Sequence, residues 1–263
     1  MWEEYVYTGL TINKLAERIG TSLSTVKRRL REVRVSHHCA ELASRHGVIH
    51  LDTTYFNRNN GLLVVLEAVT NRVLYRKHVR TETRQEYELA IDDILSRGYK
   101  IDGIVSDGMR WLFSSYEDIP KQMCQFHMKQ IVRRYLTTNP KCKPSQDLWE
   151  LTLDMDKLGE KDFNNKLEVW GNKWCKYLNE RTLQKDGKRC YKHRRLRSAV
   201  NSLKYFLPYL FTYERFPDMP STNNRIEGFF SDLKAVLGRH RGMNETNRDR
   251  LIDDYINRHG LRQ

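Results

Sequence analysis

The fold is decided by residues 48–56, VIHLDTTYF, and by residues 62–66, LLVVL, which follow the tripeptide Asn59-Asn60-Gly61. The first run is typical of a β-strand, and the second is the longest apolar run in the chain. An Asn-Gly pair between two such runs is a strong signal for a β-hairpin. A second turn at residues 70–71 leads into residues 73–75, VLY. We therefore predict three meandering strands.

Strands and helices alternate after this meander. Thr83, with Glu86 three residues on, forms a capping box that predicts the start of a helix. Residues 101–107 and 121–126 are each typical of a strand. The order β-β-β-α-β-α-β over residues 47–127 predicts an α/β fold in which helices flank a mixed sheet.

The first 35 residues carry a helix-turn-helix pattern. Thr11 can cap one helix, and Gly20 permits the tight turn into a second helix. Ala16 lets the two helices cross closely, and Val26 fills the gap between them. The polar face of the second helix suits base edges and phosphates of a DNA groove. That face consists of Ser24, Thr25, Lys27, Arg28 and Arg31. The alternative is a helical hairpin that only packs on the rest of the protein.

Residues 140–215 have apolar side chains at helical spacing and are predicted to be helical. Trp170 and Trp174 belong to this pattern, and the simplest interpretation makes both core residues. The basic run 185–197, which contains Arg194 and Arg195, is either a solvated surface or a phosphate contact. A final helix is predicted near residues 222–238, where one apolar stripe recurs.

Composition narrows the functional classes. The 263 residues carry 46 Lys and Arg against 33 Asp and Glu, a formal charge of +13, which favours a nucleic acid as partner. No apolar run is long enough to span a bilayer, and no secretion signal is visible, so we expect no membrane contact. The five cysteines form no Cys-x-x-Cys pair, which favours a reducing compartment and a cytoplasmic location.

Three carboxylates stand where chemistry is expected. Asp52 lies inside the first strand, Asp107 ends another strand before Gly108, and Glu227 adjoins the apolar stripe of the last helix. Carboxylates so placed can converge on Mg²⁺, and two such ions ~4 Å apart can drive phosphoryl displacement. A lone strand aspartate is more often an edge or capping residue. The long interval between Asp107 and Glu227 indicates that residues 140–215 are an insertion before the glutamate helix.

Four motifs in this order resemble one family. They are residues 51–55 (LDTTY), 104–108 (IVSDG), 123–127 (MCQFH) and 223–234 (NNRIEGFFSDLK). Together they resemble a DDE transposase of the Mutator-like superfamily, found in bacterial insertion sequences. The resemblance covers about residues 45–258. It implies a ribonuclease-H-like core with an all-helical insertion, and a catalytic triad of Asp52, Asp107 and Glu227 that binds two Mg²⁺ or Mn²⁺ ions.

The resemblance also implies a domain organisation. We expect a helix-turn-helix domain in 1–35, the first part of the core in 45–139, the insertion in 140–215, and the last part of the core in 216–263. Relatives often begin with a zinc ribbon, and no cysteine precedes this helix-turn-helix.

The activity implied is binding of element ends in double-stranded DNA, followed by metal-dependent strand cleavage and transfer of the 3′-hydroxyl. A homo-oligomer on DNA and a nucleoid-associated cytoplasmic location are expected with it. Two alternatives stay open: a non-catalytic DNA-binding remnant or regulator, and a metal-dependent nuclease of the same fold.

Supporting roles are expected for residues beside the triad. Cys124 and His127 form a Cys-x-x-His that lacks the partners of a closed zinc site. The corresponding pair in the family is essential, so we expect Cys124, His127 and Asn223 to support the active site. In hairpin-forming relatives a tryptophan of the insertion stacks on an extruded base, a role open to Trp170 or Trp174.

Overall fold

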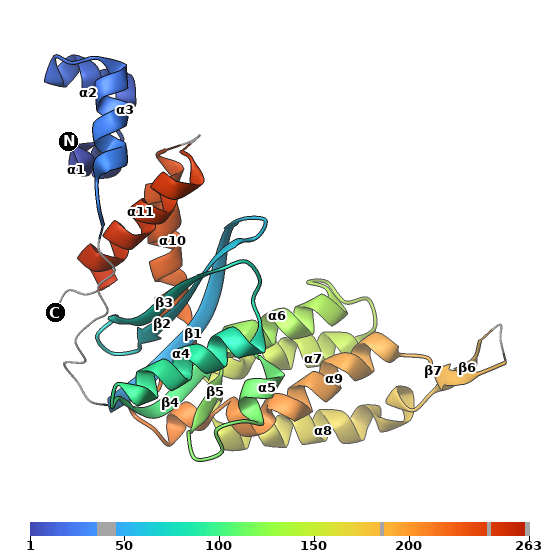
Figure 1. The fold of residues 1–263 in the computed structure, drawn as a ribbon. Helices are drawn as coiled ribbons and strands as arrows, with labels where there is room; N and C mark the ends of the chain where they lie inside the picture. Colours follow the sequence, from blue (N-terminus) through green and yellow to red (C-terminus); the bar gives the residue numbers. More distant parts are fainter. Residues whose placement is uncertain (36–45, 185–186, 241–242, 261–263) are drawn as a thin grey trace. The chain divides into compact units, whose positions relative to one another are not determined.

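The computed structural model describes residues 1–35, 46–184, 187–240 and 243–260 (Figure 1). These residues form two compact units. The first contains the described parts of 1–46, 51–100 and 224–263, and the second contains 47–50 and 101–223. Among the described residues, no helix combines the length and the apolar character needed to cross a bilayer.

A five-stranded sheet has the hydrogen-bonded order β3-β2-β1-β4-β5. Its strands are β1 (His46–Asn57), β2 (Asn60–Glu67), β3 (Val73–Val79), β4 (Lys100–Ser106) and β5 (Lys121–Met123). β2 pairs antiparallel with β3, and β4 pairs parallel with β5. The prediction of a mixed sheet flanked by helices is confirmed. β1 contributes residues to both units.

Strand β2 forms the core of the first unit because all eight of its residues are buried. Side chains on a strand alternate between faces. Leu62, Val64 and Leu66 pack in one apolar cluster with residues of α10 (Asn224–Gly238) and α11 (Glu245–Tyr255). On the opposite face the Glu67 carboxylate accepts a hydrogen bond from the Tyr99 hydroxyl. The π-helical turn Ile256–Gly260 follows α11.

Helix α4 (Arg84–Ser96) begins where its capping residue predicts. Thr83 Oγ1 accepts the backbone N–H of Glu86 at 3.3 Å. The Glu86 carboxylate pairs with Lys77 Nζ on β3 at 2.6 Å. The glutamate of the capping box therefore ties the helix to the sheet.

The first unit also contains α1 (Trp2–Thr8), α2 (Ile12–Ile19) and α3 (Leu23–Glu32). Thr11 and Ser22 cap α2 and α3, and Gly20 takes the left-handed conformation at φ 67° in the turn between them. Ala16 and Val26 are buried in the cluster of these helices, as predicted, together with Leu251 of α11. The two helices and their turn are therefore present, and their contact with DNA stays a prediction.

The helices of the second unit are α5 (Arg110–Phe113), α6 (Gln125–Leu136), α7 (Lys143–Leu153), α8 (Glu160–Leu178) and α9 (Arg194–Phe206). The longer four lie side by side and enclose one large apolar cluster (Figure 1). A 3₁₀ turn at Asp154–Lys157 connects α7 to α8, and two more, at Leu207–Tyr209 and Thr212–Glu214, follow α9.

The prediction of an all-helical insertion is wrong. A two-stranded antiparallel hairpin of β6 (Arg181–Leu183) and β7 (Arg189–Tyr191) lies between α8 and α9. The dipeptide Asp186-Gly187 is the hairpin signal that could have revealed it, and Gly187 has φ 78°. Flanking basic residues hid the apolar-polar alternation on which a strand prediction depends.

An ion cluster fastens α7 to α8. The Asp147 carboxylate accepts hydrogen bonds from Lys173 Nζ at 2.8 Å and from Trp174 Nε1 at 3.1 Å, and it pairs with Lys143 Nζ at 2.9 Å. The hydrogen bond from Lys173 has the largest effect, and with Lys143 and Trp174 it lowers the pKa of Asp147 to about 2.

We expect the Asp147 carboxyl to titrate near pH 2 in the folded chain. Because its folded pKa lies below its ordinary value of 3.8, the stabilisation is complete above pH 4 and disappears as the pH falls toward 2. NMR titration of the side-chain carboxyl carbon measures the pKa directly. Asp147→Asn should lower the free energy of unfolding by about 1 kcal/mol at pH 7. An unshifted pKa would contradict the ion cluster.

Candidate active site

Asp52 lies on β1 with its orientation fixed by its neighbour. Thr53 Oγ1 is 2.9 Å from the Tyr87 hydroxyl of α4, and Tyr87 donates in turn to Glu82 at 2.7 Å. Burial is the main cause that raises the pKa of Tyr87 far above its ordinary value, so the hydroxyl stays protonated. Since successive strand residues point to opposite faces, Asp52 faces away from α4.

His50 lies on the same face of β1 as Asp52, two residues earlier. Its Nδ1 is 2.8 Å from Asn223 Oδ1, and both side chains are fully buried. An amide oxygen only accepts, so Nδ1 of His50 carries the proton and donates. Asn223 is the residue directly before α10, so this bond brings the start of that helix to β1.

The end of β5 holds Asn223 from a second direction. Cys124 Sγ accepts the backbone N–H of Asn223 at 3.3 Å. The backbone N–H of Cys124 donates to the carbonyl of Ser106 at 2.9 Å, and that of Gln125 donates to Ser221 at 3.0 Å. A continuous set of hydrogen bonds thus joins the last residue of β4, the end of β5 and the residues before α10.

Glu227 lies one helical turn after Asn223, and its Oε1 is buried. Its neighbours Ile226 and Phe230 pack against β2 on the face that carries Leu62. Asp52 and Glu227 both belong to the first unit. From strand alternation and helix register we expect both carboxylates on the face of the sheet that α10 covers.

Asp107 belongs to the second unit and follows β4 directly. Its Oδ1 is buried and makes no hydrogen bond within the described residues. Gly108 has φ 105°, and an added Cβ would lie 3.0 Å from Met123 Cε, so the exit from the strand requires glycine. A buried carboxylate oxygen without a donor is costly unless a cation neutralises it, so Asp107 fits the ligand role predicted for it.

A metal centre stays a prediction. In the described ranges, no three His, Cys, Asp or Glu side chains lie close enough together to hold a metal ion. The predicted donors are carboxylate oxygens, which hard divalent cations prefer.

His127, one turn into α6, is half-buried, and its ring lies 5.6 Å from that of Phe126. Cys124 contacts Asn223 through a hydrogen bond, and its support of an active site stays a prediction.

The predicted DNA-facing residues of α3 divide into two groups. The hydroxyls of Ser24 and Thr25 each lie 2.9 Å from Ser22 Oγ, at the start of the helix. The cationic side chains of Lys27, Arg28 and Arg31 are exposed.

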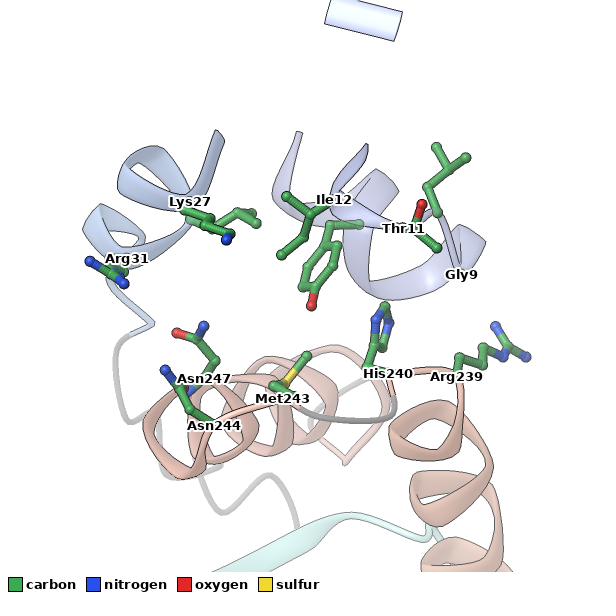
Figure 2. Close-up of a pocket in the computed structure, with 13 residues that line it drawn as sticks. Gly9, Thr11, Ile12, Lys27, Arg31, Arg239, His240, Met243, Asn244 and Asn247 are labelled. Atoms are coloured by element: carbon green, nitrogen blue, oxygen red, sulfur yellow. The ribbon is translucent and has the colours of Figure 1, made fainter. Parts of the chain in front are cut away.

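Lys27 and Arg31 also line a pocket of about 400 Å³ in the first unit (Figure 2). Figure 2 shows Lys27 directed toward Ile12 across this pocket, while the Arg31 guanidinium points away from it. Arg239 and His240 line the other side. The sequence analysis missed both, although they begin a basic stretch directly after the last predicted helix.

The base-stacking role suggested for Trp170 does not fit the structure. Trp170 is 5% exposed in the apolar cluster of the second unit, and its Nε1 donates to the Pro144 carbonyl at 3.0 Å. This burial leaves little of the ring open to a base, so Trp170 is a core residue. Trp174 is partly buried, and the Lys173 ammonium lies 4.8 Å from the centre of its ring.

The two arginines predicted to bind DNA in the second unit are both exposed. Arg194 begins α9, and Arg195 donates to the Arg134 carbonyl at 2.9 Å. Their contact with phosphate stays a prediction.

Replacing Asn223 tests the bond that places α10. We expect Asn223→Ala to lower the free energy of unfolding by about 1–3 kcal/mol, because it removes the buried acceptor of the His50 N–H. Urea denaturation measures the change. Asn165→Ala, at an exposed position of α8, is the matched control. Equal stability of the two variants would contradict the role of Asn223.

Comparisons with known proteins found one similarity to report. No protein-family model matches the chain, and no curated protein matches it. The chain is similar to a solved structure described as the Drosophila P element transposase strand transfer complex. The two are 11% identical with a TM-score of 0.41, over 95% of this chain and 89% of that chain. Because this score is low, the functional argument rests on the residues of the chain itself.

Proposed function

We propose that this protein is a DDE-type DNA transposase of the Mutator-like superfamily, which cuts DNA at the ends of an insertion sequence and transfers the 3′-hydroxyl to a target. The observation that carries the proposal is the His50–Asn223 bond. It supports a site in which Asp52 and Glu227 share one face of the sheet. The buried, unbonded Oδ1 of Asp107 adds the third predicted ligand.

The three carboxylates act as metal ligands in this proposal. Asp52, Asp107 and Glu227 would together hold the divalent ions. Two bound Mg²⁺ or Mn²⁺ ions would supply an activated nucleophile and charge stabilisation for the leaving oxygen. The chain itself positions the carboxylates: Tyr87 fixes the neighbour of Asp52, and Cys124 with His50 fixes the start of the glutamate helix.

In this proposal, α3 recognises the DNA ends. Its exposed Lys27, Arg28 and Arg31 suit a major groove and its phosphates. Two paired ends would bring two copies of the chain onto one DNA complex. The strong positive charge of the chain supports a polyanionic partner.

Conservative changes in the triad test the chemistry. Asp52→Asn, Asp107→Asn and Glu227→Gln should each abolish Mg²⁺-dependent cleavage of end-containing DNA, because each removes a charged ligand while keeping the size of the side chain. Binding of the same DNA should persist in a gel-shift assay. Glu168→Gln, at an exposed position of α8, is the control. Wild-type cutting by any of the triad variants would contradict the assignment.

Strand transfer separates a transposase from a nuclease of the same fold. A pre-cut duplex that ends in a 3′-hydroxyl should be joined to target plasmid by the wild-type chain and by Glu168→Gln, because that hydroxyl is the nucleophile of the second step. A dideoxy end should not be joined. Hydrolysis of the duplex without any joined product would favour the nuclease.

A change in α3 tests end recognition. Arg28→Gln should weaken binding of end-containing DNA by about 1–3 kcal/mol if its guanidinium contacts a base edge. Competition between end-containing and unrelated duplexes measures the loss of preference. Arg18→Gln on α2 is a charge-matched control at an exposed position. Equal preference in the two variants would remove Arg28 from the recognition surface.

A further inference from the structure

The β6–β7 hairpin projects from the helices of the second unit (Figure 1). Every residue of β6 is exposed, so the hairpin buries little side-chain surface of its own. An isolated two-stranded hairpin is marginally stable in water. Contacts with the neighbouring helices must therefore stabilise the β6–β7 hairpin.

Arginine and aromatic side chains supply those contacts at the base of the hairpin. The Arg181 guanidinium carbon lies 4.7 Å from the centre of the Tyr191 ring, and that of Arg197 lies 3.5 Å from it. Arg197 also donates to the carbonyl of Leu178, the last residue of α8. The backbone N–H of Lys192 donates to the carbonyl of Glu180 at 2.9 Å. These contacts fix the base of the hairpin to α8 and α9.

A basic pocket adjoins the hairpin. It has a volume of about 520 Å³, and its lining contains no aspartate or glutamate. The lining comes from α6, the start of α7, the start of α9 and the residues that connect them. Its basic members are Lys141, Lys192, His193, Arg194 and Arg195.

Glu180, an acidic side chain at the base of the hairpin, is already neutralised. Glu180 Oε2 lies 3.1 Å from Lys192 Nζ and 3.0 Å from His193 Nε2. Five further cations of the hairpin and of the pocket form what we call the hairpin surface. It consists of Lys141, Arg181, Arg189, Arg194 and Arg195, all of them exposed.

We propose that the hairpin surface binds the sugar–phosphate backbone of duplex DNA, as a second contact separate from α3. The proposal rests on the proposed function for the identity of the polyanion. A two-stranded ribbon fits a DNA groove, and arginines that flank such a ribbon reach the phosphates on either side. Leu183, 67% exposed and paired with Arg189, adds an apolar contact of the kind that groove-binding ribbons use.

The salt dependence of binding tests this surface directly. In the triple variant Lys141→Gln/Arg189→Gln/Arg194→Gln, three positive charges are removed from exposed side chains that make no hydrogen bond or ion pair with the described part of the chain. The probe is a fluorescent duplex that lacks the element ends. Its binding is measured by fluorescence anisotropy at KCl concentrations from 50 to 300 mM. We expect binding at least about tenfold weaker at the low-salt end. The slope of log K against log salt should become shallower by about 0.9 per lost phosphate contact.

Two matched variants separate local contact from overall charge. Lys161→Gln/Lys166→Gln/Lys204→Gln removes the same charge from exposed positions of α8 and α9 outside the hairpin surface, and it should change the slope little. Lys141→Arg/Arg189→Lys/Arg194→Lys keeps the charge and should restore the wild-type slope. Unchanged circular dichroism melting shows that each variant is folded.

The outcomes distinguish this proposal from the proposed function. Equal slopes and affinities for the two glutamine variants would overturn the hairpin surface as a DNA contact. A slope change confined to the hairpin variant supports the hairpin surface as a DNA contact. This holds even if the wild-type chain proves unable to cleave DNA, because that failure would overturn only the transposase. A wild-type chain that binds no duplex would overturn both.

Discussion

The buried hydrogen bond between His50 and Asn223 is the constraint on which the candidate site depends. It fixes where the polypeptide enters α10 and therefore where Glu227 lies along the sheet. Cys124 reinforces it by accepting the N–H of Asn223 through sulfur. If Asn223 moved, the register between the glutamate helix and the strand that carries Asp52 would be lost, although the apolar packing of α10 could survive.

Much of the fold could be predicted because its signals are local. Capping residues, the left-handed Gly20 and the apolar run of β2 act within a few residues, and the structure has each of them as expected. The β6–β7 hairpin was missed because its strands are short and bear charged side chains. Helix α11 was not predicted because most of its residues are polar. Its buried residues Leu251 and Ile252 pack against residues that are distant in the sequence.

Less of the candidate site than of the fold could be predicted from the sequence. Residue type and position singled out Asp52, Asp107 and Glu227, but nothing local shows that His50 bonds to Asn223. For Trp170 the spacing allowed both a core role and a stacking role, and its burial favours the core. The function of Cys124 likewise depends on a partner far along the chain, so its motif predicted importance without the contact that explains it.

The proposed function requires three carboxylates to bind paired divalent ions. An anomalous difference map from crystals soaked in Mn²⁺ measures this directly. We expect two manganese peaks about 4 Å apart, with Asp52, Asp107 and Glu227 as their ligands. A map with no manganese at these side chains, or with their carboxylate oxygens too far apart to share an ion pair, would contradict it.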